Sequence, residues 1–164
     1  MDNNYLYAVA NIRANELSLL SRADIDALID APDYKTALTL LDGKGYDTSF
    51  GSDYSAMLDG ETEKTWSLIK SVAPSAEALD IFIVKNDFQN LKAVLKSEKT
   101  GDDAEKYLVS PSVIPKELLL KAVKERDFAS LPDFISGAAE KCLEVITKTE
   151  NGQLCDIAAD RSLP

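Results

Sequence analysis

The 164-residue chain contains no histidine and only two cysteines. Histidine is the commonest general base and a frequent zinc ligand, and it is the usual partner of a serine or cysteine nucleophile. Cys142 and Cys155 form no CxxC motif and do not have the spacing of a disulfide framework, so we expect both thiols to be reduced. The sequence therefore predicts no catalytic site, no metal site and no cofactor site.

Basic residues and long apolar runs are also scarce. The chain has 28 acidic residues against 18 basic ones, a net charge of −10, which repels phosphate backbones and argues against a nucleic-acid partner. Apolar runs such as Ile81 to Val84 are far shorter than the roughly 20 residues that cross a bilayer. The N-terminus lacks the basic and then apolar order of a signal peptide. We expect a cytoplasmic chain that does not itself span the membrane.

Glycine and proline are few, at 7 and 6 residues, and β-branched residues do not gather into alternating runs. Abundant Leu, Ala, Lys and Glu favour helix, so the sequence predicts an all-α fold of antiparallel helical units. The polar segment Lys99 to Glu105 is the expected boundary between these units. Residues 1–100 are then the first helical unit, and 101–164 are a second, incomplete one.

Apolar spacing and capping residues predict the positions of the helices. Asp53 is expected to cap one of them, and Asn86-Asp87 is expected to restart another. The run Ile81 to Val84 is compatible with a strand, but its flanks favour helix. The expected helical segments are 4–20, 22–29, 34–41, 54–72, 76–85, 88–97, 116–124, 132–151 and one that begins at Gln153.

Three segments share the order Asp, aromatic, two residues, apolar. They begin at Asp33, Asp87 and Asp127, and in each the aspartate is expected to accept hydrogen bonds from the first turn of a helix. Three ordinary capped helices are the favoured interpretation. Diverged repeats of one helical unit are the alternative, but spacings of 54 and 40 residues are too unequal to establish a repeat.

Several acidic positions superficially suggest binding sites. The stretch Asp42 to Asp47 lacks the pattern of a phosphate-binding loop or an EF-hand, so we interpret it as a turn that ends a helix. Asp24 with Asp26, and Asp102 with Asp103, are interpreted as solvated charges, because neither pair lies beside an apolar segment that would raise a pKa.

Three segments, taken in order, resemble a known family. Residues 7–13 with 19–21 look like an opening helix of the form YAxANARIRxxExxLL. Residues 84–96 (VKNDFQNLKAVLK) are similar to a helix ending YDxxNLKxLL(R/K), although Phe88 departs from that pattern. Residues 114–157 resemble the stretch that leads to an (I/L)DxxLD(R/K) element. The family is the C subunit of V/A-type rotary ATPases, known as the d subunit in eukaryotic vacuolar ATPases.

The resemblance implies a non-catalytic central-stalk subunit with a funnel of three helical units. A protein of this kind couples the shaft of subunits D and F to the membrane rotor ring of proteolipid subunits, for ion transport or ATP synthesis, on the cytoplasmic face of the membrane. Because family members are about twice as long, this chain resembles their N-terminal half. The alternative is a general helical adaptor that binds another cytosolic protein.

The resemblance also marks six residues as structural or partner-facing candidates. In the second segment we expect Phe88 and Leu91 to pack inward, whereas Asn90 and Lys92 are open to either role; a purely structural helix is the favoured interpretation. Arg13 is expected to form a surface or groove ion pair. The candidates are Arg13, Asp87, Phe88, Asn90, Leu91 and Lys92.

Overall fold

The computed structural model describes residues 4–75 and 77–163 and contains eight α-helices within them. Short 3-10 helices lie between some of these, and no strand occurs in the described residues, so the predicted all-α class is confirmed. The α-helices are α1 (Asn4–Glu16), α2 (Arg22–Ile29), α3 (Tyr34–Asp42), α4 (Tyr54–Val72), α5 (Asp80–Thr100), α6 (Lys116–Glu125), α7 (Asp133–Thr149) and α8 (Gly152–Asp160). The 3-10 helices are η1 (Thr48–Phe50), η2 (Glu77–Leu79), η3 (Ala104–Tyr107) and η4 (Phe128–Ser130).

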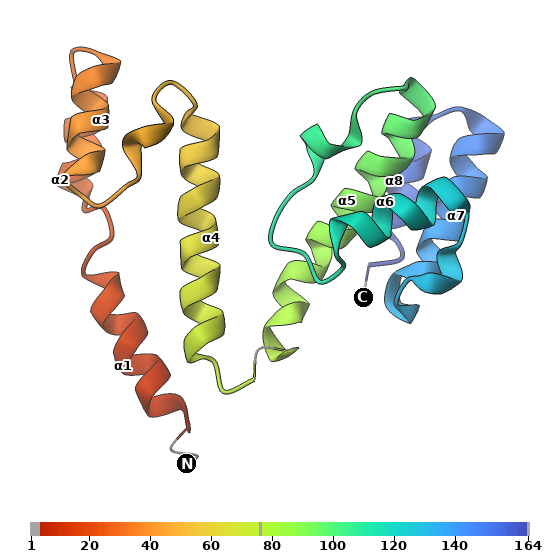
Figure 1. Ribbon diagram of the computed structural model, residues 1–164, viewed down its shortest axis with the longest axis horizontal. Helices are drawn as coiled ribbons and strands as arrows, with labels where there is room; N and C mark the ends of the chain where they lie inside the picture. Colours follow the sequence, from red (N-terminus) through yellow and green to blue (C-terminus); the bar gives the residue numbers. More distant parts are fainter. Residues whose placement is uncertain (1–3, 76, 164) are drawn as a thin grey trace. The chain divides into compact units, whose positions relative to one another are not determined.

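The chain divides into two compact units, Met1–Glu77 and Ala78–Pro164. Figure 1 shows the first from red to yellow and the second from green to blue. The division precedes α5, whereas the boundary expected from the sequence lies near residue 100. The difference arises because α5 packs against η3, α6, α7 and α8 and so belongs with the helices that follow it.

The first unit owes its local structure to side-chain caps. Ser21 and Asp24 form a capping box at the start of α2, Asp33 accepts from the backbone N–H of Thr36, and Asp53 caps α4 as predicted. Its core is small: among the described residues of this unit, the buried apolar side chains are Ala8, Met57 and Val72. Helix α1, which packs on α4, ends at Glu16 rather than Leu20, because the next residues form turns in which the Ser18 hydroxyl donates to the Asn15 carbonyl.

The second unit contains the main hydrophobic core. Its centre is α5, and the most extensive contact between two of its helices is that of α7 with α8. Large apolar side chains of this core are almost completely inaccessible to solvent: Phe88, Leu91, Leu95, Ile114, Leu119, Val123 and Ile135. Both cysteines are free and buried, and the Cys142 thiol donates to the carbonyl oxygen of Cys155 at 3.6 Å.

Helix α5 is one continuous element where the sequence predicted two. The predicted restart at Asn86-Asp87 was wrong, because these side chains bond to a distant segment of the chain and do not cap their own helix. The helix continues to Thr100 and ends at Gly101, whose φ of +79° places it in the left-handed conformation that favours glycine. The run Ile81 to Val84 is helical, as its flanks indicated.

A pair of leucine variants tests where the stability of the fold resides. Leu91→Ala removes a side chain that is 0% exposed, and it should lower the free energy of unfolding of the second unit by about 2–5 kcal/mol. Leu17→Ala removes one that is 89% exposed, and it should change that free energy by less than about 0.5 kcal/mol. Urea denaturation followed by circular dichroism measures both. Equal effects would contradict a core centred on α5.

Candidate functional site

The polar residues of the family-like motif lie on α5 and face the segment 109–114. Asp87 and Asn90 are 0% and 1% exposed, which is rare for such side chains unless every polar atom has a partner. Among the described residues that are not exposed, no buried side-chain nitrogen or oxygen lacks a hydrogen bond. The site is therefore a network of hydrogen bonds beside the hydrophobic core, in which the buried polar atoms of these side chains all have partners.

Asp87 binds the backbone just before α6. Its Oδ1 accepts from the N–H of Ile114 at 2.9 Å, and its Oδ2 accepts from the N–H of Val113 at 3.1 Å. Burial raises the pKa of this carboxyl group, and the two N–H donors, which favour the charged form, offset part of that rise. Asp87 thus holds the chain at the entrance to the next helix.

Asn90 and Asn86 hold the same segment at two further points. The Asn90 Nδ2 donates to the carbonyl oxygen of Val109 at 3.1 Å, while its Oδ1 accepts from the N–H of that residue at 2.8 Å. The amide of Asn86 donates to the carbonyl oxygen of Pro111 at 2.8 Å. We call the side chains of Asn86, Asp87 and Asn90 together the α5 clamp.

The apolar members of the motif lie on the core side of α5. Phe88 is 2% exposed and Leu91 is fully buried, and both belong to the core cluster that Ile114 also joins. A single stretch of α5 therefore supplies both hydrogen bonds to the backbone of 109–114 and side chains to the core. The structure brings together Asp87, Phe88, Asn90 and Leu91.

Lys92 begins a series of ion pairs along α5. Its Nζ lies 2.8 Å from Asp160, Lys96 lies 2.6 Å from Asp156, and Lys99 lies 2.8 Å from Glu150. These pairs connect α5 to α8 and to the end of α7. Lys96 and Lys99 also line a pocket of about 370 Å³ beside the start of α8. The sequence reasoning missed this series, although lysines four and three residues apart on a helix share one face.

Arg13 lies in the other unit and joins none of these contacts. Its guanidinium pairs with Glu16 at 2.8 Å on the surface of α1, where the arginine side chain is 75% exposed. An exposed pair of this kind contributes at most about 1 kcal/mol. Arg13 is accordingly a surface ion pair in this structure, as expected from the sequence.

The three Asp-aromatic segments do not share one role. Asp33 caps α3, but Asp87 lies inside α5 and binds a different segment, and Asp127 precedes η4 without a capping side-chain bond. The expectation that each aspartate accepts from the first turn of its own helix was thus correct for Asp33 alone. The reason is that aspartate bonds to whichever free N–H groups the fold brings near, not only to those that follow it.

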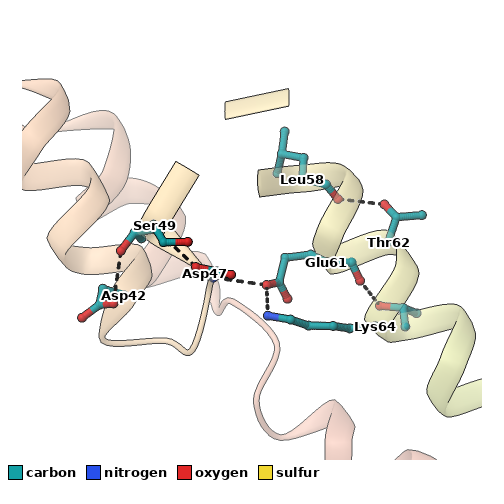
Figure 2. Close-up of polar contacts among 9 residues, drawn as sticks. Asp42, Asp47, Ser49, Leu58, Glu61, Thr62 and Lys64 are labelled. Atoms are coloured by element: carbon teal, nitrogen blue, oxygen red, sulfur yellow. Dashed lines mark hydrogen bonds and ion pairs between the residues drawn. The ribbon is translucent and has the colours of Figure 1, made fainter. Parts of the chain in front are cut away.

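Carboxylates of the 42–47 turn are engaged within the first unit (Figure 2). Asp42 accepts from the hydroxyl of Thr48, and Asp47 accepts from the N–H of Ser49. Glu61 accepts from the N–H of Asp47 and from Lys64. In the structure, α3 ends at Asp42 and a turn follows with Gly45 at a φ of +88°, as the sequence interpretation required.

In the two acidic pairs considered above, Asp24 with Asp26 and Asp102 with Asp103, each carboxylate bonds to a partner of its own. Asp24 pairs with Lys44 at 2.8 Å while it caps α2, and Asp26 pairs with Arg22 at 3.0 Å. The Lys44 ammonium, together with Ser21, lowers the pKa of Asp24 to about 2. Asp102 accepts from the Thr100 hydroxyl, and Asp103 caps η3. Neither pair resembles two carboxylates that share a proton.

Membrane-spanning helices and metal clusters are both absent from the part of the chain that the structure describes. None of its helices is long and apolar enough to cross a membrane. In residues 4–75 and 77–163, no group of three or more cysteine, aspartate or glutamate side chains is placed to hold a metal ion.

Comparison with known proteins identifies the family. The model of the ATP synthase (C/AC39) subunit family matches residues 8–163, which include parts of both units. The chain belongs to this family.

A curated relative, the C subunit of the V-type sodium ATPase of Enterococcus hirae, is 25% identical over 154 residues. That alignment covers 92% of this chain and 47% of the relative, so the chain spans about half the relative's length. No solved structure matches. The resemblance found in the sequence is therefore confirmed.

The α5 clamp generates a prediction about stability. Asp87→Asn replaces one carboxylate oxygen by an NH₂ group, which would face the N–H of Val113 or Ile114. A buried donor without an acceptor costs about 1–3 kcal/mol. The neutral amide avoids the cost of burying a charged carboxylate, but this gain offsets only part of that loss. We expect a lower free energy of unfolding and faster amide exchange at 113–114.

The matched control for the clamp is Glu140→Gln, the same change of charge at an exposed position of α7. It should leave the free energy of unfolding within about 0.5 kcal/mol of the wild type. Chemical denaturation and hydrogen exchange measured by NMR provide both readouts. Unchanged exchange at 113–114 in Asp87→Asn would show that the clamp does not hold this segment.

The Asp24–Lys44 pair generates a prediction about pH. Because the folded pKa of Asp24 lies below its ordinary value of 3.8, the pair stabilises the fold above that value, and this stabilisation is lost as the pH falls towards 2. Lys44→Met should raise the pKa of Asp24 towards 3.8. Lys70→Met, which changes an exposed lysine on α4, is the control and should leave it near 2. Carbon-13 NMR titration of the carboxyl groups measures both values.

Proposed function

We propose that the chain is a non-catalytic central-stalk subunit of a V/A-type rotary ATPase. In this role it couples the shaft formed by subunits D and F to the membrane rotor ring of proteolipid subunits, on the cytoplasmic face of the membrane. The complex would use that coupling for ion transport or for ATP synthesis. The observation that carries the proposal is the family match across residues 8–163.

The organisation of the described residues supports a role in transmitting force and not in chemistry. The buried polar groups of the motif are all used to hold the chain's own backbone, which leaves none of them free for a substrate. Helix α5 is tied to α8 and the end of α7 by three ion pairs in addition to the core. A rigid, well-connected unit is what a coupling part requires.

A general helical adaptor is the competing function. It would share the all-α fold and the acidic charge, which suit many interaction proteins. The family match favours the rotary-ATPase role, because residues 8–163 include the α5 motif and all but the first residue of the two flanking segments. The two functions differ in their partners and are separated by binding experiments.

Reconstitution tests the proposal directly. The purified chain is mixed with the cognate D–F shaft, with detergent-solubilised rotor ring, and with both, and each mixture is separated by size-exclusion chromatography. We expect co-elution with the shaft or the ring and the most stable complex with both present. Serum albumin, another acidic helical protein, serves as the control and should co-elute with neither. If the chain also binds neither, the adaptor function replaces the proposal.

A further inference from the structure

Helices α7 and α8 bury mainly small side chains against the rest of the second unit. The buried residues of α8 are Cys155, Ala158 and Ala159, and those of α7 include Ala138, Ala139 and Cys142. The contact between these two helices is also the most extensive in the unit. Small side chains allow two helix backbones to approach each other closely. A disulfide requires such an approach, because its two Cα atoms are usually about 4.4–6.8 Å apart.

The two cysteines of the chain meet at this contact. Both are free and 0% exposed, and they lie on different helices joined by a short turn. The Sγ of Cys142 lies 3.6 Å from the carbonyl oxygen of Cys155, to which its thiol donates. No other side chain separates the sulfur of Cys142 from the backbone of Cys155. The two residues are therefore direct neighbours across the α7–α8 contact while their thiols are reduced.

The surroundings of the two thiols make them chemically unequal. A hydrogen bond from the Cys142 thiol lowers the pKa of Cys155, and the ammonium groups of Lys96 and Lys92 act in the same direction against burial and Asp156. The same hydrogen bond and burial raise the pKa of Cys142. Because the thiolate is the reactive form of cysteine, Cys155 is the nucleophile of the pair and Cys142 is the second thiol.

We propose that Cys142 and Cys155 form a peroxide-sensitive dithiol, whose oxidation to a disulfide links α8 covalently to α7. The Cys155 thiolate attacks one oxygen of hydrogen peroxide, the O–O bond breaks, and hydroxide leaves, which gives a sulfenic acid. The sulfur of Cys142 then attacks the sulfenic sulfur, and the S–S bond forms as water leaves with the thiol proton. In total, two thiols and one peroxide give one disulfide and two waters. A small dithiol reverses the reaction by exchange and is itself oxidised.

Access to the buried thiols requires movement of α8. This helix has nine residues, and two ion pairs connect it to α5, Lys92 with Asp160 and Lys96 with Asp156. A short element that depends partly on accessible ion pairs opens locally more often than the centre of a core. Hydrogen peroxide is small enough to enter during such openings. The inference goes beyond the proposed function, because it assigns a chemical property to this chain alone and requires no partner.

Peptide mapping of the peroxide-treated chain tests the proposal. After treatment the remaining thiols are blocked with iodoacetamide, and trypsin then separates the cysteines into peptides 142–148 and 149–161, each ending at a lysine or arginine. We expect these peptides to be joined by a disulfide and the intact chain to lose two hydrogens in mass. The melting temperature of the second unit should rise by at least about 5 °C, and dithiothreitol should reverse both changes.

Cysteine variants test the roles of the two thiols. Cys142→Ser should form no disulfide within the chain and should leave a sulfenic acid at Cys155, which dimedone traps. Cys155→Ser should leave Cys142 unlabelled by dimedone, because the pKa of this thiol is raised. Circular dichroism checks that both variants are folded.

A third variant tests access and keeps both cysteines. Asp160→Asn removes one ion pair of α8, and it should speed disulfide formation about two- to fivefold. Glu140→Gln makes the same change of charge at an exposed position of α7 and is the control, with an unchanged rate.

Several outcomes would overturn the proposal. Absence of the joined peptides, or a disulfide between two chains on a non-reducing gel, would show that the cysteines do not form a pair. An unchanged melting temperature after oxidation would show that the bond does not secure α8. Equal rates in Asp160→Asn and Glu140→Gln would contradict access through α8. Binding to the D–F shaft and the rotor ring is measured without peroxide, so the two proposals fail separately.

Discussion

The hydrogen bonds from α5 to residues 109–114 are the constraint on which the second unit depends. This segment lies between η3 and α6, outside regular structure, so its backbone groups need partners from elsewhere. Asp87 and Asn90 supply them, and Ile114 is thereby held in the core beside Phe88 and Leu91. Loss of these bonds would expose both the backbone and the apolar side chain that it positions, which couples polar and hydrophobic stability in one short stretch of helix.

The two units differ in how much of their apolar surface they bury within themselves. The second buries a continuous cluster from α5 to α8, whereas the first buries few large side chains and leaves Tyr5, Val9 and Tyr54 exposed. A small unit of this kind gains less from hydrophobic burial, so the capping bonds of Ser21, Asp33 and Asp53 account for more of its order. The unit with less internal burial is also the one with more surface to offer another protein.

Sequence alone was sufficient for features set by local chemistry. Low glycine and proline content predicted the all-α class, and Asp53 could be recognised as a cap because its acceptor acts on the N–H groups that follow it. The continuity of α5 could not be predicted, since Asn86-Asp87 has the composition of a helix start while its partners lie at Pro111, Val113 and Ile114. Which residues meet across such a distance depends on packing, and a single sequence does not contain that information.

The role of the motif also bears on where binding surfaces should be sought. Asp87, Phe88, Asn90 and Leu91 identify the family, yet each is buried and occupied by the chain's own backbone or core. Their spacing is explained by folding, so the motif is an argument for a shared fold and not for contact with a partner. Residues that contact partners must be accessible, and they need not belong to the most recognisable segment.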